Sequence, residues 1–318
     1  MLSCISRRDC CGSVLLVLLL VAGCYADVSA NNVIAQASAL SHSGKTKQAE
    51  AVLRSALAAH PDSTDLHGAL GELLFRQQQY EQAVEELGTA AQGAPDSREY
   101  NLLLAEALIG WRHFGVAVEF LNAVGSRFEN EPQYHYDLGL AYYNLNKMAL
   151  AQKEVEQALR LRPNLDPAQY LLGGCLLAAG DSAGALQQFR KLVEEKPGKA
   201  TYWAALAQVL ETTGSQAEAL RAAERALSLA PRDAHVQYVS ATVFTESGQF
   251  ARARPYWERL EKLDPSVLSV HVQLARVYSR LGERDLARKE TAVVKELRSR
   301  SARPSPPADQ PPTSDQNQ

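Results

Sequence analysis

Histidine and cysteine side chains offer the most obvious chemistry in this chain of 318 residues, which contains seven histidines and five cysteines. The histidines include no His-Glu-x-x-His helix pair, and none stands at metal-ligand spacing from a cysteine or carboxylate with a second pair to complete a site. His67, His135 and His271 occupy the same place in a recurring sequence pattern. Such regularity is typical of packing positions, so the sequence predicts no metal site.

The cysteines and one glycine-containing segment make no better case for catalysis. Cys175 is the single cysteine after residue 24, which excludes a framework of disulfides in that part of the chain. We expect it to be a small core residue, without the exposure and activation that a nucleophile needs. Gly44-Lys45-Thr46 resembles the end of a phosphate-binding loop, but Ala39 stands where such a loop requires glycine. The sequence therefore predicts no catalytic residue, no cofactor and no enzyme activity.

The charge of the chain is nearly balanced, with 33 lysines and arginines against 36 aspartates and glutamates. Without an excess of cations the chain has little with which to neutralise phosphates, so we expect no nucleic-acid partner. The hydrophobic fraction is 46% and the charged fraction is 22%, which is the composition of a folded chain rather than a disordered one.

The first 23 residues are typical of a secretory signal peptide. Arg7 and Arg8 precede an apolar run over residues 14–22, which is shorter than the roughly 20 residues of a membrane span. Residues 21–24, Val-Ala-Gly-Cys, resemble the lipobox of bacterial lipoproteins, in which the cysteine is acylated and becomes the new first residue. The resemblance implies a lipid anchor on Cys24, followed by a short linker over residues 24–29.

Two destinations are compatible with this amino terminus. Tyr25 stands where, in bacterial lipoproteins, an aspartate would favour retention in the inner membrane. The resemblance thus implies an outer-membrane lipoprotein that faces the periplasm and is held by lipid rather than by a transmembrane helix. Ordinary cleavage near Ala26 or Ala30 would instead leave a soluble periplasmic or secreted protein.

The rest of the chain repeats every 34 residues, without insertions. A recurring alanine is followed four and seven residues later by mostly apolar residues, and these spacings place the three positions on one helical face. Small residues such as Gly71, Gly139 and Gly173 recur in the preceding half of the repeat, where they let two helices approach closely. The recurring alanines are Ala49, Ala83, Ala117, Ala151, Ala185, Ala219, Ala253 and Ala287. Glycines expected in a left-handed turn between the two helices are Gly44, Gly180, Gly214, Gly248 and Gly282.

A helix-turn-helix unit of this length and pattern resembles the tetratricopeptide repeat (TPR). Residues 200–233 are nearly a consensus copy, with Trp203, Ala207, Ala219 and Pro231 among the matching positions. The resemblance implies an all-α fold, a right-handed α-solenoid of about eight repeats over residues 30–301. The expected repeats are 30–63, 64–97, 98–131, 132–165, 166–199, 200–233, 234–267 and 268–301.

The last repeat should be a polar cap, because the end of a solenoid must be soluble. Thr291 replaces the bulky apolar residue of the other repeats, and Lys289, Glu290 and Glu296 are expected on a solvent-facing helix. Residues 302–318 are rich in proline and polar residues, and we expect a disordered tail there.

TPR arrays line a concave groove with the first helix of each repeat, and the resemblance implies that this groove binds a protein or peptide. The expected groove is acidic toward the amino-terminal repeats and basic in the last, with tyrosines between as anchors. Some of these rings could instead fill space between adjacent helices. The expected groove residues are Glu72, Phe75, Glu99, Leu102, Glu106, Ile109, Gln133, Tyr136, Tyr143, Tyr170, Leu177, Tyr238, Arg276 and Arg280.

Two functional classes follow from this groove. The first is a non-catalytic interaction scaffold of the bacterial cell envelope, which holds a partner protein in the groove. The second is a substrate-handling or regulatory subunit of an envelope enzyme or of a secretion or assembly complex. We favour the scaffold, because the segments outside the repeats are too short to supply an enzyme domain.

Overall fold

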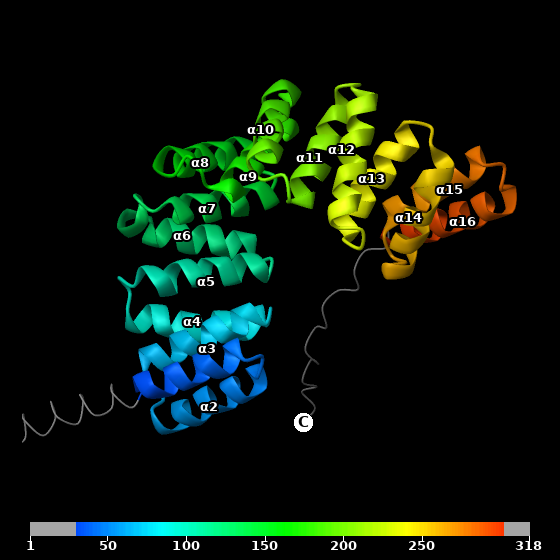
Figure 1. Cartoon of the computed structure of the whole chain (residues 1–318). Coiled ribbons are helices and arrows are strands. Elements are labelled where there is room, and N and C mark those ends of the chain that lie inside the picture. Colours follow the sequence, from blue (N-terminus) through cyan, green and yellow to red (C-terminus); the bar gives the residue numbers. More distant parts are fainter. Residues whose placement is uncertain (1–29, 302–318) are drawn as a thin grey trace, which may run out of the picture. The chain divides into compact units, whose positions relative to one another are not determined.

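The computed structural model describes residues 30–301, and this part of the chain is built of helices and short connections without a β-strand. It forms two compact units that divide between Ala168 and Gln169, within helix α9 (Figure 1). The first helices of successive repeats begin at equivalent places of the predicted repeat, for example at Thr64, Arg98 and Pro132. The all-α repeat fold predicted from the sequence is therefore confirmed.

The bounds of the helices follow the repeat closely. The first unit contains a helical segment over residues 30–42, then α2 (Thr46–Ala59), α3 (Thr64–Arg76), α4 (Tyr80–Gly93), α5 (Arg98–Gly110), α6 (Phe114–Phe128), α7 (Pro132–Asn144) and α8 (Met148–Leu161). Helix α9 (Asp166–Ala178) crosses the division. The second unit continues with α10 (Ser182–Glu195), α11 (Ala200–Thr212), α12 (Gln216–Leu229), α13 (Ala234–Glu246), α14 (Phe250–Leu263), α15 (Leu268–Arg280) and α16 (Arg284–Ser301).

The helices of a pair pack closely because small residues stand at their crossing. A Cβ atom at Gly71 would lie 2.6 Å from Cγ of Leu87, and one at Gly139 would lie 2.7 Å from Cγ2 of Val155. The repeated alanines Ala49 through Ala253 are at most 1% exposed. These contacts confirm the predicted role of the small residues, since a larger side chain would separate the two helices.

The turn inside every repeat contains one residue with a left-handed backbone. The five predicted glycines have φ angles between 74° and 86°. Gln78, Arg112 and Asn146 occupy the same place in three other repeats, with φ angles of 61°, 64° and 58°. The repeat therefore imposes this conformation even where the sequence supplies no glycine to relieve its cost.

A side-chain hydrogen bond recurs near the start of the first helices and joins each to the preceding repeat. The donor is a ring or amide nitrogen, and the acceptor is the carbonyl oxygen six residues earlier. Nε1 of Trp203 donates to Pro197 O at 2.9 Å, and Nε2 of His67 and Pro61 O are 2.8 Å apart. The same contact is made by Asn101, His135, Gln237 and His271. The interpretation of His67, His135 and His271 as packing residues is thus confirmed, although each also contacts a carboxylate.

The terminal helix α16 differs from the expected cap at one residue. Thr291 and Lys289 are exposed, as expected of a solvent-facing helix. Glu290 was expected to face solvent but is only 3% exposed, and its carboxylate lies 2.7 Å from Nδ1 of His271. The expectation was wrong because Glu290 has a partner on the other helix of the same repeat, far from it in the sequence.

The expected signal peptide over residues 1–23, Cys24, the linker over residues 24–29 and the tail over residues 302–318 lie outside the described residues. Within residues 30–301, no helix combines the length and the apolar character needed to cross a membrane.

Candidate partner-binding surfaces

The first unit contains a hollow of about 370 Å³ on the first helices α3, α5 and α7. We call it the α3–α7 hollow. It brings together five residues that the sequence assigned to the groove, namely Glu72, Glu99, Leu102, Glu106 and Gln133. Leu102 is only 7% exposed, so it contributes mainly to the core. The remaining lining residues are Arg98, Leu103 and Arg162.

The carboxylates around this hollow are linked by one amide. Nε2 of Gln133 donates to Oε1 of Glu106 at 3.0 Å and to Oδ1 of Asp137 at 2.9 Å. Burial raises the pKa of Glu106, although the Gln133 hydrogen bond opposes that change. Burial disfavours the charged carboxylate, whereas a donated hydrogen bond stabilises it. The side of the hollow formed by Glu106 therefore favours a positively charged group.

Asp137 is a polar residue that the sequence did not single out. It is 1% exposed, and its Oδ2 atom has no hydrogen-bond partner in the described part of the chain. Burial raises its pKa well above the usual range, and the nearby charge of Glu106 raises it further. The sequence carried no signal for this, because a lone aspartate in a helix is ordinarily a surface residue.

A second hollow of about 280 Å³ adjoins the first through shared residues Glu72, Glu99 and Leu103. Asp65 also lines it, and accepts a hydrogen bond from the Tyr100 hydroxyl at 2.9 Å. Glu72 pairs with Arg76 at 2.5 Å, so part of its charge is compensated. The two hollows together form an acidic surface on the first unit.

The predicted apolar anchors of the first unit differ in availability. Phe75 and Ile109 are partly buried and pack against the core. The Phe75 ring also meets Tyr80 edge-on, with ring centroids 5.8 Å apart. Tyr136 and Tyr143 are half-buried on α7 and lie one heptad apart, so they share a helical face.

The predicted anchors of the second unit are occupied by packing. Tyr170 stacks on Tyr202 with ring centroids 5.7 Å apart, and Tyr238 meets Trp257 edge-on at 5.1 Å. Leu177 is likewise partly buried against the core. Tyr238 borders only a small hollow of about 70 Å³, together with residues such as Gln208 and Glu211. The space-filling interpretation left open by the sequence therefore describes Tyr170 and Tyr238 better than the anchor interpretation does.

The expected basic end of the groove is not simply basic. Arg276 donates from both terminal nitrogens to the carboxylate of Glu246, and this hydrogen bonding raises the pKa of the arginine. Arg280 is exposed. Burial, followed by the charge of Glu246, raises the pKa of Glu211 on the same unit. The second unit therefore presents mixed charges, because a carboxylate on the neighbouring first helix neutralises Arg276.

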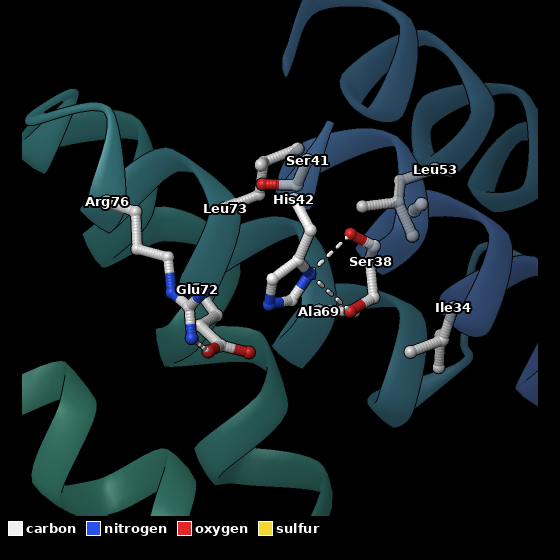
Figure 2. A pocket seen from close by; sticks show the side chains of 10 residues that line it. Ile34, Ser38, Ser41, His42, Leu53, Ala69, Glu72, Leu73 and Arg76 are labelled. Carbon is white, nitrogen blue, oxygen red and sulfur yellow. Dashed lines mark hydrogen bonds and ion pairs between the residues drawn. The ribbon is translucent and has the colours of Figure 1, made fainter. Parts of the chain in front are cut away.

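A small pocket near the amino-terminal end contains serine, histidine and glutamate, which raises the question of nucleophilic chemistry (Figure 2). Nδ1 of His42 lies 2.7 Å from the Ser38 carbonyl oxygen and 3.4 Å from Ser38 Oγ. Because Nδ1–H donates to that carbonyl, it is unavailable to accept the serine proton. Glu72 bonds to Arg76 rather than to the imidazole, and the pocket holds only about 80 Å³. The three side chains do not form a catalytic relay.

One cluster places metal-binding side chains together. Glu261, His271 and Glu290 each offer one ligand atom, and these atoms lie within 4.8 Å of one another. Sequence reasoning missed the cluster because its members come from three different helices, at spacings that match no short metal-binding motif.

Comparison with protein families assigns the repeat. Family models described as tetratricopeptide repeat match residues 40–107, 136–200 and 200–233, which together make up more than half of the chain. The chain belongs to the tetratricopeptide-repeat family. Helix pairs α13–α14 and α15–α16 lie outside the matched residues but continue the regular spacing of this TPR protein. TPR domains are generally protein-binding scaffolds, and this fold suggests the same role here.

Solved structures support the fold assignment. A tetratricopeptide repeat protein from Parabacteroides merdae is 17% identical with a TM-score of 0.66, and the match covers 78% of this chain and 98% of that one. PilF of Pseudomonas aeruginosa is 20% identical with a TM-score of 0.56, covering 68% and 99%. PilW, described as a type IV pilus biogenesis factor, is 18% identical with a TM-score of 0.59, covering 66% and 98%. At these identities the likeness concerns the fold alone. No curated protein matches the sequence.

Proposed function

We propose that this TPR protein is a non-catalytic scaffold that binds a basic, extended segment of a partner protein on the α3–α7 hollow. The observation that carries the proposal is the convergence of Glu72, Glu99 and Glu106 on one open hollow of about 370 Å³. A lysine or arginine of the partner would gain a charge-assisted hydrogen bond there. Arg98 and Arg162 line the same hollow. The Arg98 guanidinium pairs with Glu131 at 2.7 Å, so the three carboxylates still outnumber the cations that face the hollow.

The test begins with capture of a partner from bacterial envelope extracts and continues with one matched pair of variants. Glu106→Gln removes the charge that faces the hollow, whereas Glu85→Gln removes an exposed charge on the second helix α4. We expect Glu106→Gln to weaken binding by about tenfold and to reduce its salt dependence. Glu85→Gln should bind as the wild type does. Equal affinity of all three proteins would place the partner on another surface.

We further propose that the scaffold belongs to the bacterial cell envelope and is anchored through acylated Cys24. The basic residues and apolar run before Cys24, and the lipobox-like residues 21–24, support this location. If the proposal is right, the wild-type protein partitions with membranes into detergent, and Cys24→Ala changes its processing. A lipid-free mature chain beginning near Asp27 or Asn31 would instead favour the soluble periplasmic or secreted alternative.

The second candidate function is a subunit of an envelope assembly complex. The fold similarity to PilW, described as a type IV pilus biogenesis factor, favours keeping this alternative. The two proposals differ in the captured partner. Capture of a single protein by the wild type that is lost with the Glu106→Gln variant supports the scaffold. Capture of a stable multi-protein complex by both proteins supports the assembly role.

A further inference from the structure

Three repeats contain a histidine–glutamate pair that joins the first helix to the second. Nδ1 of the histidine lies 2.6 Å from Oε2 in His67–Glu86, 2.8 Å in His135–Glu154 and 2.7 Å in His271–Glu290. The His271–Glu290 pair is the most deeply buried, with side chains that are 3% and 4% exposed. The three pairs share one geometry, so what distinguishes them is the side chains that surround each pair.

The difference is a third ligating side chain in the last repeat. Glu261 of α14 brings a carboxylate oxygen within 4.8 Å of both a ring nitrogen of His271 and the Glu290 carboxylate. The residues at the equivalent place before the histidine are Leu57 and Gly125 in the other two repeats. The Glu261 carboxylate makes no hydrogen bond or ion pair within residues 30–301. Two carboxylates thus converge on one imidazole, and one of them lacks a partner.

The imidazole is oriented as a metal ligand would be. Nε2 of His271 donates to the Pro265 carbonyl at 2.9 Å, which leaves Nδ1 facing the Glu290 carboxylate. Metal-binding histidines almost always donate their other ring nitrogen to a carbonyl or carboxylate in this way, because that bond fixes the ring. The same bond exists in the other two pairs, so it prepares the ring in all three repeats. Only the last repeat adds the further carboxylate.

We propose that Glu261, His271 and Glu290 form a binding site for a divalent transition-metal ion of the zinc type. One imidazole and two carboxylates suit zinc, which takes such ligands at about 2.0 to 2.2 Å and keeps water in the fourth position. Tetrahedral bonds of that length place ligand atoms roughly 3.3 Å apart. The present ligand atoms lie between 2.7 Å and at most 4.8 Å apart, so shifts of up to about 1.5 Å, made by changes of side-chain rotamer, reach this geometry.

Binding has a defined balance of charge and protons. The proton between Nδ1 of His271 and the Glu290 carboxylate leaves to solvent as the metal takes its place. The ion then compensates Glu261 and Glu290, which otherwise repel each other. It also joins α14, α15 and α16, so its binding free energy adds to the stability of the carboxyl-terminal helices.

The test uses the full chain with zinc as the probe, near neutral pH. Isothermal titration measures affinity and stoichiometry, and thermal melting is compared with and without a chelator. Glu261→Gln removes the third ligand but leaves the His271–Glu290 pair, so the fold should persist. Glu86→Gln is the matched control, because it alters a pair that has no third carboxylate.

We expect the wild type and Glu86→Gln to bind zinc alike and to melt higher with the metal than with the chelator. Glu261→Gln should bind at least about tenfold more weakly and lose the shift in melting. The absorption spectrum of the protein with cobalt in place of zinc reports which ligands hold the ion. Bound cobalt without a thiolate-to-metal charge-transfer band supports this site. Three results would overturn the proposal. The first is an absence of zinc binding by the wild type, and the second is zinc binding by Glu261→Gln that is as tight as that of the wild type. The third is a thiolate band in the cobalt spectrum that Glu261→Gln retains.

Discussion

The two units use the same repeat, and yet the hollows described on their first helices differ in size. In the first unit, Glu99 and Glu106 border a hollow of about 370 Å³. In the second, Tyr238 borders a hollow of about 70 Å³ and its ring packs on Trp257. The backbone spacing does not differ between them, so the side chains of the first helices account for the difference between the two hollows.

The charge of the two surfaces differs for the same reason. Arg276 of the second unit is satisfied by Glu246, which lies on the preceding first helix. Glu106 at the α3–α7 hollow has no ion pair of this kind, since the amide of Gln133 supplies the hydrogen bonds to Glu106 and Asp137. A hydrogen bond from an amide does not cancel the charge of a carboxylate. A basic ligand therefore has more to gain on the first unit.

The largest difference that we expect between the two units is in the effect of truncating one tyrosine in each of them. Tyr143→Ala removes an expected anchor from α7 and should weaken partner binding by about 2 kcal/mol. Tyr238→Ala should leave partner binding largely unchanged and should lower the stability of the protein, because the Tyr238 ring packs against Trp257. Binding titrations and urea denaturation of both variants would separate the two roles. If Tyr238→Ala weakened binding more than Tyr143→Ala, the assignment of the surface to the first unit would be wrong.

The buried aspartate of the first unit predicts a smaller effect, which depends on pH. Burial and the charge of Glu106 raise the pKa of Asp137, so the folded state binds its proton more tightly than the unfolded state does. This contribution to stability is present at low pH and is lost as pH rises through the raised pKa. In Asp137→Asn the free energy of unfolding should therefore decline less steeply as pH rises. At the upper end of the pH range the variant should be more stable than the wild type.

Urea denaturation over a series of pH values measures this decline. Asp62→Asn is a suitable control, because Asp62 is exposed in a loop of the same unit. A wild-type profile that is parallel to that of Asp137→Asn would show that Asp137 is not protonated preferentially in the folded state.

The sequence predicts the fold in detail because the repeat register determines backbone and core together. From Gly44 alone, the register also locates the left-handed residues Gln78 and Arg112, although their types gave no hint of it. Side-chain pairing was much harder to predict. Glu290 looked like a surface residue of the cap and Arg276 like a free cation, but each has a partner on another helix. Helical periodicity relates residues within one helix, so it carries no information about partners on a different one.

The last and smallest effect concerns those left-handed turns. All three non-glycine residues there, including Gln78, belong to the first unit, whereas the corresponding turns of α11–α12 and its second-unit neighbours contain glycine. A non-glycine residue in this conformation costs about 1 to 2 kcal/mol, and glycine costs about 0.5 to 1 kcal/mol through the entropy of the unfolded chain. Gln78→Gly should therefore stabilise the protein by about 0.5 to 1 kcal/mol.

The reciprocal change Gly214→Gln should destabilise the second unit by a similar amount. A Cβ atom at Gly214 would meet nothing within 4 Å, so the cost comes from the backbone conformation and not from a clash. Urea denaturation of both variants measures the two changes, with Gly88→Ala as a helical control whose added Cβ also meets nothing within 4 Å. Alanine has a higher helix propensity than glycine, and nothing else changes in that control, so Gly88→Ala should stabilise the protein. If Gly214→Gln stabilised the protein as Gly88→Ala does, the left-handed turns would carry no strain. The two units would then differ in their surfaces alone.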